Sequence, residues 1–340
     1  MSAPWYDDAS LAARARREPW LGLAGRSLAS RLAPVVSRRA LGFGFEVHAD
    51  DEALAAVVDR LYGDFDPPGT PGGAATLSVV HDRRGGPERF RVYADGGPVA
   101  RCRTPDLALS YLMWLVNRGV ITHSRDRLLF HAAAASQEDS GVLLPASMES
   151  GKTTLVAGLV ASGLSYLSDE VGALDLQSGE LVAYPKPLTV DPGSFRVLGA
   201  LPARVPGALR PWYGRQWQVP HAALRPGPPA RRCRVRHVVF PRYAAGAVTE
   251  LAPLRRTEAL ALLVENSFNF ADRPGEHLEA MAEMLRGATC HRLVSGDLEE
   301  ACRGVLALMG AEPLEGAVAA LRDDRPAPDG SAADALGGAA

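Results

Sequence analysis

Residues 146–153 read Ala-Ser-Met-Glu-Ser-Gly-Lys-Thr and fit the pattern A-x-x-x-x-G-K-T, which is typical of a phosphate-binding loop. In such a loop, backbone N–H groups at the start of a helix point toward a phosphate, and the helix dipole favours the negative charge. Lys152 would reach the β- and γ-phosphates, and the hydroxyl of Thr153 would ligate Mg²⁺. The sequence therefore predicts a nucleotide site with contacts from Ala146, Ser147, Ser150, Gly151, Lys152, Thr153 and Thr154.

The segments on either side suit such a loop. Residues 142–144 form a short apolar run of the buried-strand type, and residues 154–164 continue with helical apolar spacing. Two positions depart from the commonest pattern. Ala146 replaces the first glycine, and the carboxylate of Glu149 must point outward to avoid repelling a nucleotide. The alternative is an incidental Gly-Lys-Thr at a helix start, but the order strand, loop and helix favours a phosphate site.

An acidic pair follows the predicted helix. Asp169 and Glu170 interrupt a β-type apolar stretch, 166–174, near the strand end that would face the loop. Phosphoryl transfer requires charge neutralisation and a carboxylate that orients or deprotonates the attacking hydroxyl. Because ligands of open α/β sheets collect at the carboxyl ends of strands, Asp169 is placed for that role. The alternative is that the pair caps a turn or is solvated.

Other side chains are candidates for contacts with the transferred phosphoryl group. His131 ends an apolar run, where a histidine is either a core residue or a ligand of the phosphates. Lys186, Arg242, Arg255 and Arg256 are candidates for a second cation, because anionic oxygens are usually clamped by more than one. Arg242 is favoured because it follows the apolar run 238–240, whereas the other three are interpreted as solvated surface charges.

The stretch around these residues resembles the catalytic core of the HPr serine kinase/phosphorylase family. There, a strand with a histidine leads into the loop, and the following helix runs to a strand that ends in an acidic pair, as His131, Lys152 and Asp169 do here. Phosphoenolpyruvate carboxykinases share the Gly-Lys-Thr-Thr-Leu run. The resemblance covers about residues 125–310. It implies an α/β fold: a P-loop HPr kinase C-terminal-like catalytic domain with a mixed sheet and flanking helices.

The resemblance also implies a chemistry. The cofactors would be ATP and Mg²⁺, Asp169 would be the general base, and Glu170 would support Mg²⁺ directly or through water. Short later segments, such as Tyr184-Pro185-Lys186-Pro187-Leu188, are similar to kinases of this kind found beside peptide and natural-product biosynthesis genes. No stretch after the loop matches the segment with which the HPr enzymes grip their protein substrate and dephosphorylate it.

Three functions are compatible with these observations. The first is an ATP- and Mg²⁺-dependent kinase that phosphorylates a hydroxyl, either a Ser side chain of a peptide or a small natural product. The second is a nucleotide-binding scaffold or NTPase in which Asp169 activates no acceptor. The third is a bifunctional kinase/phosphorylase of a carrier protein. The sequence favours the first.

Changes in pattern along the chain predict its domain organisation. Residues 1–40 predict a helical segment that docks on the body or, alternatively, a basic amphipathic membrane or partner helix. Residues 41–122 predict a small α+β domain, and 123–315 the catalytic domain. Within it, 191–234 is rich in Pro, Gly, Arg and Trp, and is interpreted as an acceptor-binding lid or a disordered insertion. Residues 320–340 predict a disordered tail.

Composition narrows the class of protein. A formal net charge of −2 argues against a general nucleic-acid binder. Four scattered cysteines indicate neither a zinc site nor a disulfide framework. No apolar run is long enough to span a membrane, and charges near the N-terminus break any signal-peptide pattern. We therefore expect a cytoplasmic protein without stable membrane insertion, which could form a homo-oligomer.

Overall fold

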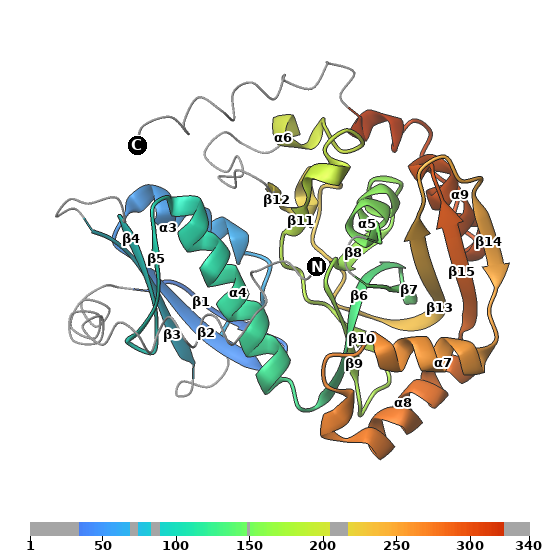
Figure 1. Cartoon of the computed structure of the whole chain (residues 1–340), viewed down its shortest axis with the longest axis horizontal. Coiled ribbons are helices and arrows are strands. Elements are labelled where there is room, and N and C mark those ends of the chain that lie inside the picture. The colour runs from blue at the N-terminus through green and yellow to red at the C-terminus, as the bar shows by residue number, and fades with distance from the viewer. Residues whose placement is uncertain (1–33, 69–73, 83–88, 148–149, 205–216, 323–340) are drawn as a thin grey trace.

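The computed structural model describes residues 34–68, 74–82, 89–147, 150–204 and 217–322, which form two packed α/β units (Figure 1). The N-terminal unit, residues 34–123, is a five-stranded sheet in the order β1-β2-β3-β4-β5, in which only β2 and β3 are parallel. Its strands are β1 (Pro34–Ala40), β2 (Phe43–Ala49), β3 (Ala75–His81), β4 (Phe90–Ala94) and β5 (Gly97–Cys102). Its helices, α3 (Glu52–Leu61) and α4 (Pro105–His123), pack against this sheet.

Local sequence explains several of these elements. Phe45 and Val47 alternate with more exposed neighbours in β2, as expected for a strand with one buried face. Helix α3 begins after Asp51, whose side chain accepts a hydrogen bond from the backbone N–H of Leu54 at 3.0 Å. In α4, a Cβ on Gly119 would lie 2.4 Å from the ring of Phe43, so the close approach of helix and sheet requires glycine.

The prediction of a helix over residues 1–40 is wrong for its last seven residues. They form strand β1, and residues 1–33 lie outside the described part of the chain. Val36 and Ala40 are buried on the core side of the sheet, and β1 pairs with β2 across a tight turn in which Leu41 has a φ of 52°. Sheet pairing decides the conformation here, because intrinsic helix preference is weak enough for tertiary contacts to override it.

The larger unit, residues 127–322, is built on an eight-stranded mixed sheet in the order β10-β9-β6-β7-β13-β15-β14, with β8 paired to β6. Among the described strands of this sheet, the parallel pairings are those of β13 with β7 and with β15, so the carboxyl ends of these three strands share one edge. The strands are β6 (Arg127–Gln137), β7 (Ser140–Pro145), β8 (Ser165–Ser168), β9 (Val171–Asp175), β10 (Leu181–Val182), β13 (Arg232–Tyr243), β14 (Glu250–Pro253) and β15 (Thr289–Ser295).

Helices cover both faces of this sheet (Figure 1). On one face lie α5 (Lys152–Ala161) and α9 (Leu298–Leu308), and on the other lie α7 (Arg256–Glu265) and α8 (Pro274–Arg286). Each face of the sheet forms an apolar core with its helices. In β7, the fully buried Leu144 packs in the core with α5, and the fully buried Leu143 packs in the core with α7 and α8. Each such leucine contributes about 1.5–3 kcal/mol by leaving water. The mixed α/β architecture agrees with the predicted α/β class, whereas the HPr kinase-like domain type stays a prediction.

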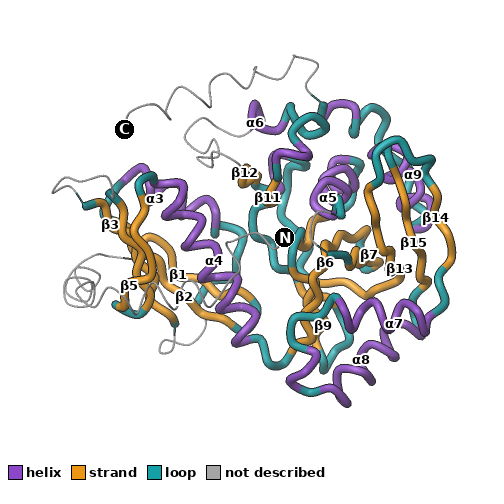
Figure 2. The backbone as a smooth tube through the Cα atoms, viewed as in Figure 1, coloured by secondary structure: helices purple, strands orange, loops and turns teal. Residues whose placement is uncertain are grey.

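The described parts of segment 191–234 are ordered rather than structureless (Figure 2). They contain η2 (Pro192–Ser194), α6 (Leu201–Arg204), β12 (Trp217–Val219), η4 (His221–Ala223) and the start of β13. Strand β12 pairs with β11 (Leu188–Val190), and Leu198 and Val219 are buried in the same core as α5. Apolar residues between the Pro and Gly positions supply this packing. The central residues 205–216, including Trp212 of the predicted lid, lie outside the described residues.

The first residues of the predicted disordered tail, 320–322, belong to the described part of the chain. Residues 319–321 form the short helix η6 (Ala319–Leu321), and Leu321 is completely buried. Its backbone carbonyl accepts a hydrogen bond from the N–H of Ala200 at 3.0 Å, which fixes it against the segment before α6. Residues 323–340 lie outside the described part of the chain.

The two units share one continuous apolar core. Phe65 of the N-terminal unit contacts Tyr184 of the larger unit with ring centroids 5.5 Å apart, and Leu129 and Ala173 join the same cluster.

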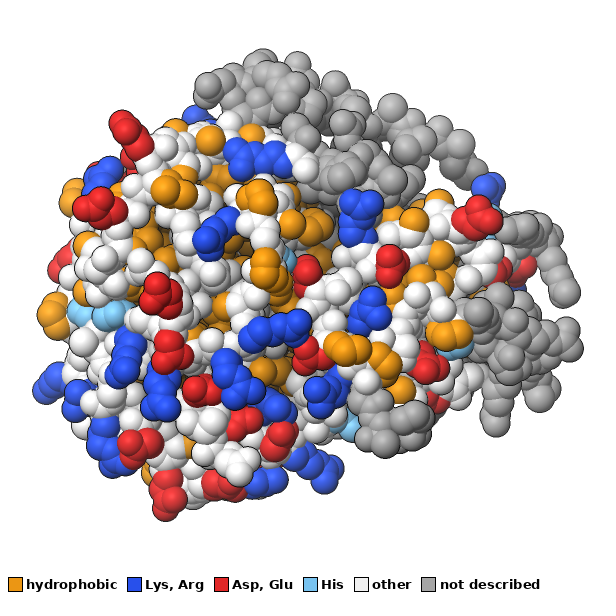
Figure 3. Space-filling view, turned by 180° about the vertical axis from the view of Figure 1, so that it is seen from behind, with side chains coloured by type: hydrophobic (Ala, Val, Ile, Leu, Met, Phe, Trp, Pro, Cys, Tyr) orange, Lys and Arg blue, Asp and Glu red, His pale blue; other side chains and the backbone are white. Residues whose placement is uncertain are grey.

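On the face shown in Figure 3, acidic and basic side chains are interspersed, so their fields largely cancel. None of the helices in the described residues is both long enough and apolar enough to span a bilayer.

Candidate active site

The loop between β7 and α5 lies at the edge of the sheet where the parallel strands end. Gly151 has a φ of 87°, a left-handed conformation that glycine adopts without strain, and a Cβ there would lie 3.2 Å from Cβ of Tyr243. The N–H of Tyr243, at the end of β13, donates to the carbonyl of Ser150 at 3.0 Å. At the other end, the N–H of Ala146 donates to the carbonyl of His131 at 3.3 Å. Both ends of the loop are therefore anchored to neighbouring strands.

Lys152, the first residue of α5, turns its side chain back into this loop. Its Nζ donates to the carbonyl of Ala146 at 2.7 Å and to that of Ser147 at 2.6 Å, and the residue is only 6% exposed. Burial lowers the pKa of Lys152 to about 8, although Asp169 and Glu170 act in the opposite direction. The ammonium group is therefore held in the loop and is mostly protonated at neutral pH.

Asp169 lies in the turn between β8 and β9 and is 3% exposed. Its Oδ1 accepts a hydrogen bond from the Tyr166 hydroxyl at 3.1 Å and forms an ion pair with Nζ of Lys186 at 2.8 Å. Its Oδ2 accepts from the backbone N–H of Thr189 at 2.9 Å. Burial first, and then Asp169, raise the pKa of Tyr166 well above its usual value, so this hydroxyl remains a donor. Three donors thus fix the orientation of the Asp169 carboxylate.

Lys186 links the two members of the acidic pair. Its Nζ lies 2.8 Å from Asp169 and 3.2 Å from Oε2 of Glu170, and the residue is 2% exposed. Burial alone would lower the pKa of Lys186, but the two carboxylates raise it above its usual value. Lys186 therefore stays protonated and supplies a positive charge beside both carboxylates.

The interpretation of Lys186 as a surface charge is wrong, because the residue is buried, whereas the contact expected between Arg242 and the transferred phosphoryl group stays a prediction. Among the described residues, Arg242 is exposed and forms no ion pair or hydrogen bond with the acidic pair. Arg255 and Arg256 are exposed at the start of α7, and Arg255 pairs with Glu258 at 3.0 Å. The missed signal was the setting of Lys186, which lies between two prolines and next to Tyr184 and Leu188, both buried.

His131 lies where the charges of Lys152 and Asp169 affect its pKa. It is half-buried at the end of the part of β6 that pairs with β9, and its ring lies 5.5 Å from that of Phe268. Burial and the nearby charge of Lys152 lower its pKa to about 4, against an opposing effect of Asp169. His131, Lys152 and Asp169 are therefore mutual electrostatic neighbours. At neutral pH the imidazole is uncharged and can donate one hydrogen bond and accept another.

This depressed pKa predicts a pH dependence of stability. Between pH 6.5 and about 4, the unfolded chain binds a proton at His131 that the folded chain does not. The free energy of unfolding should therefore fall as the pH is lowered through this window and be independent of His131 above it. The free energy of unfolding in urea is measured from pH 4.5 to 7.5 for the wild type and for His131→Gln. The variant should lack the part of the decrease that is due to His131. Parallel curves would contradict the assignment.

The structure describes Thr153 and Thr154 of the predicted nucleotide site but not two residues in the middle of the loop. Thr153 is half-buried at the second position of α5. The hydroxyl of Thr154 is 2.5 Å from that of Ser194 in η2, which ties the first turn of α5 to the segment after β11. Met148 and Glu149 lie outside the described residues, so the outward direction expected for the Glu149 carboxylate is untested.

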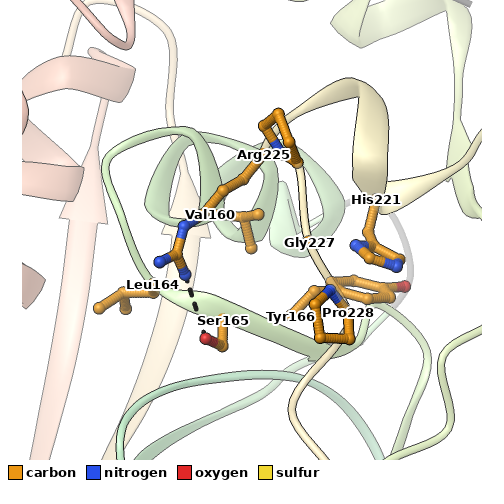
Figure 4. Close-up of a pocket in the computed structure, with 9 residues that line it drawn as sticks. Val160, Leu164, Ser165, Tyr166, His221, Arg225, Gly227 and Pro228 are labelled. Atoms are coloured by element: carbon orange, nitrogen blue, oxygen red, sulfur yellow. Dashed lines mark hydrogen bonds between the residues drawn. The ribbon is translucent and has the colours of Figure 1, made fainter.

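A cavity of about 230 Å³ lies beside the carboxyl end of α5 and the start of β8 (Figure 4). The ring of Tyr166, which lines it, stacks on that of His221 with centroids 5.7 Å apart, and Arg225 donates to the hydroxyl of Ser165 at 3.1 Å. The Tyr166 hydroxyl reaches Asp169, so one wall of the cavity also supports the acidic pair. The cavity is separate from the loop.

In comparisons with known proteins, the chain matches no family model and no curated protein. The HPr kinase-like family therefore stays a prediction based on its motifs, and the functional argument depends on the geometry of the site.

Proposed function

We propose that this protein is an ATP- and Mg²⁺-dependent phosphotransferase of the HPr kinase-like class, which transfers a phosphoryl group to a hydroxyl. The observation that carries the proposal is the geometry of the loop at the start of α5, where buried Lys152 donates to the carbonyls of Ala146 and Ser147 beside Gly151, together with the acidic pair Asp169 and Glu170 in the turn between β8 and β9. A loop lysine and a carboxylate on the neighbouring strand turn are the two groups that phosphoryl transfer requires most.

The loop supports the nucleotide half of this proposal. Backbone N–H groups at the start of α5 favour an anion. Gly151 adopts its left-handed conformation without strain and adds no side chain of its own beside that anion. Lys152, which now donates to two loop carbonyls, would exchange these for phosphate oxygens. A charged donor to a charged acceptor makes the stronger hydrogen bond, so the exchange is favourable.

The residues present suit Mg²⁺. Thr153 offers a hydroxyl and Glu170 a carboxylate whose side chain is 20% exposed, and Mg²⁺ prefers such oxygen ligands together with phosphate oxygens. A bound ion would offset charge on the β- and γ-phosphates.

Asp169 is proposed as the general base. Among the described residues, its Oδ2 accepts a single hydrogen bond, from Thr189, so it has a lone pair for the proton of an acceptor hydroxyl. The ion pair with Lys186 holds the carboxylate in its orientation. The proton of the hydroxyl would pass to Asp169 as its oxygen attacks the γ-phosphorus, and ADP would leave.

The acceptor is proposed to be a Ser side chain of a peptide or a hydroxyl of a small natural product. The two-stranded sheet of β11 and β12 supports a place for it, because Thr189 contacts both Asp169 and the side chain of Gln218, at 3.1 Å for the latter. Trp217 in the same sheet stacks on Phe195, with centroids 3.8 Å apart. The acceptor would approach along this small sheet, in the cytoplasm, where ATP is available.

A transfer assay tests the proposal. The protein is incubated with ATP labelled in the γ-phosphate, Mg²⁺ and a library of serine-containing peptides, and in parallel with a mixture of hydroxylated small molecules. The expected result is label in an acid-stable phosphate ester, lost when Mg²⁺ is chelated. Absence of both transfer and nucleotide binding would overturn the proposal.

A nucleotide-binding scaffold or NTPase is the second candidate, because Asp169 is 3% exposed and already has three donors. A carboxylate so enclosed can be an ion-pair centre rather than a base. Product analysis separates the two candidates. Binding of ATP, or its hydrolysis to ADP and inorganic phosphate, without label in any acceptor of the two libraries would favour the scaffold.

A further inference from the structure

The acidic pair receives a contact from outside its own unit. Asn117 lies in α4 of the N-terminal unit, and its Nδ2 donates to Oε2 of Glu170 at 3.0 Å. Its Oδ1 accepts from the hydroxyl of Tyr184, which follows β10 in the larger unit. An ionised carboxylate can only accept, so the amide nitrogen must face Glu170, and both ends of the amide are then satisfied.

Packing fixes the position of Asn117. Its neighbours on α4, Val116 and Val120, are buried in the core of the N-terminal unit. Gly119 lets the same helix turn approach the ring of Phe43. Interiors of this kind are packed like crystals and transmit displacement, so α4 presents the amide of Asn117 at a defined place.

Asn117 and Lys186 converge on one oxygen of Glu170. Nζ of Lys186 lies 3.2 Å from Oε2, the atom that accepts from Asn117. The lysine contact comes from the site itself, whereas the amide contact comes from a helix 53 residues earlier in the chain. Two donors on the same oxygen restrict the rotation of the carboxylate more than either would alone.

We infer that Asn117 is a positioning residue through which the N-terminal unit orients Glu170 for Mg²⁺·nucleotide binding. This inference depends on the proposed function. Outer hydrogen-bond partners of metal-binding carboxylates commonly change metal affinity or activity about 10–100-fold when they are removed. The N-terminal unit is thus part of the catalytic apparatus and not an independent module.

The test compares Asn117→Leu, which has a similar volume but no amide, with Thr122→Ala on the exposed part of the same helix. Calorimetry measures binding of AMP-PNP, a non-hydrolysable ATP analogue, at increasing Mg²⁺ concentrations. Asn117→Leu should raise the Mg²⁺ concentration needed for half-maximal binding about tenfold, while Thr122→Ala leaves it unchanged. Binding without Mg²⁺ should be equal in all three proteins, which a general loss of structure would not produce.

A double-mutant cycle with Glu170→Gln gives the sharper result. If Asn117 acts through Glu170, adding Asn117→Leu to Glu170→Gln should raise the Mg²⁺ requirement no further. Tyr184→Phe keeps the ring that packs on Phe65 but removes the hydroxyl that holds Asn117, so it should shift the requirement in the same direction and by less. It serves as the test if Asn117→Leu does not fold.

The outcomes separate the inference from the function on which it depends. If the wild type binds AMP-PNP with Mg²⁺ and the Asn117 and Tyr184 variants share its Mg²⁺ requirement, the positioning role is overturned and the proposed function stands. The positioning role is also overturned if Asn117→Leu raises the Mg²⁺ requirement equally in the wild type and in Glu170→Gln. If the wild type binds no AMP-PNP, the proposed function fails first.

Discussion

Replacing Lys152 by alanine is expected to lower phosphoryl transfer about 10²–10³-fold, the scale for loss of one charged contact to a reacting oxyanion. The change also removes hydrogen bonds to the carbonyls of Ala146 and Ser147. Each is worth about 0.5–1.5 kcal/mol, so the folded protein should melt a few degrees lower but still cooperatively. Turnover with labelled ATP and thermal melting, measured on the same preparation, check both parts.

Arg255→Ala is the matched control for Lys152→Ala. It removes an exposed cation that pairs with Glu258 at the start of α7, outside the loop and the acidic pair. Exposed ion pairs contribute little to stability, so both turnover and melting should stay close to those of the wild type. Turnover by Lys152→Ala as fast as by this control would remove the loop from the mechanism.

Asp169→Asn is expected to lower transfer about 10²–10⁴-fold, as for loss of a positioned base, with nucleotide affinity within a few-fold of the wild type. The structure adds a stability effect. Lys186 would keep only Glu170 as a counter-charge, and breaking a buried pair costs about 3–5 kcal/mol. Single-turnover transfer is therefore measured below the melting temperature of the variant, beside its free energy of unfolding in urea.

Lys186→Met separates the base from the ion pair. Alone, it should also destabilise the protein, because it leaves Asp169 buried without its cation. Combined with Asp169→Asn, it should restore part of the stability, since both charges are then absent, but none of the transfer. If the double variant recovers transfer together with stability, Asp169 is an ion-pair centre and the base lies elsewhere, with His131 as the next candidate.

The loop and its helix could be predicted because their signal is local. The short run from Ala146 to Thr153 fixes the hydrogen-bonding groups, and the apolar spacing on either side gives the strand and helix that the structure has as β7 and α5. The cap of α3 at Asp51 is local in the same sense. The order of the strands in the mixed sheet could not be predicted in this way, because it depends on pairings between strands far apart in the chain.

The errors arose where long-range contacts decide. Lys186 carries a charge that composition assigns to the surface, yet it is buried because two carboxylates converge on it. Asn117 is 53 residues from Glu170, and no spacing rule connects them. Strand β1 and the small β11–β12 sheet form because partner strands are available, although their own composition suggested helix and loop.

Binding of Mg²⁺·AMP-PNP to the wild type and to Lys152→Ala, measured by calorimetry, tests the central claim most directly. The account predicts one nucleotide per chain with a dissociation constant in the range of about 1 μM to 1 mM that is typical of enzyme substrates. It also predicts that affinity falls at least tenfold when Mg²⁺ is chelated or Lys152 is replaced. No binding by the wild type, or equal binding by both proteins, would contradict a phosphate site in the loop after β7.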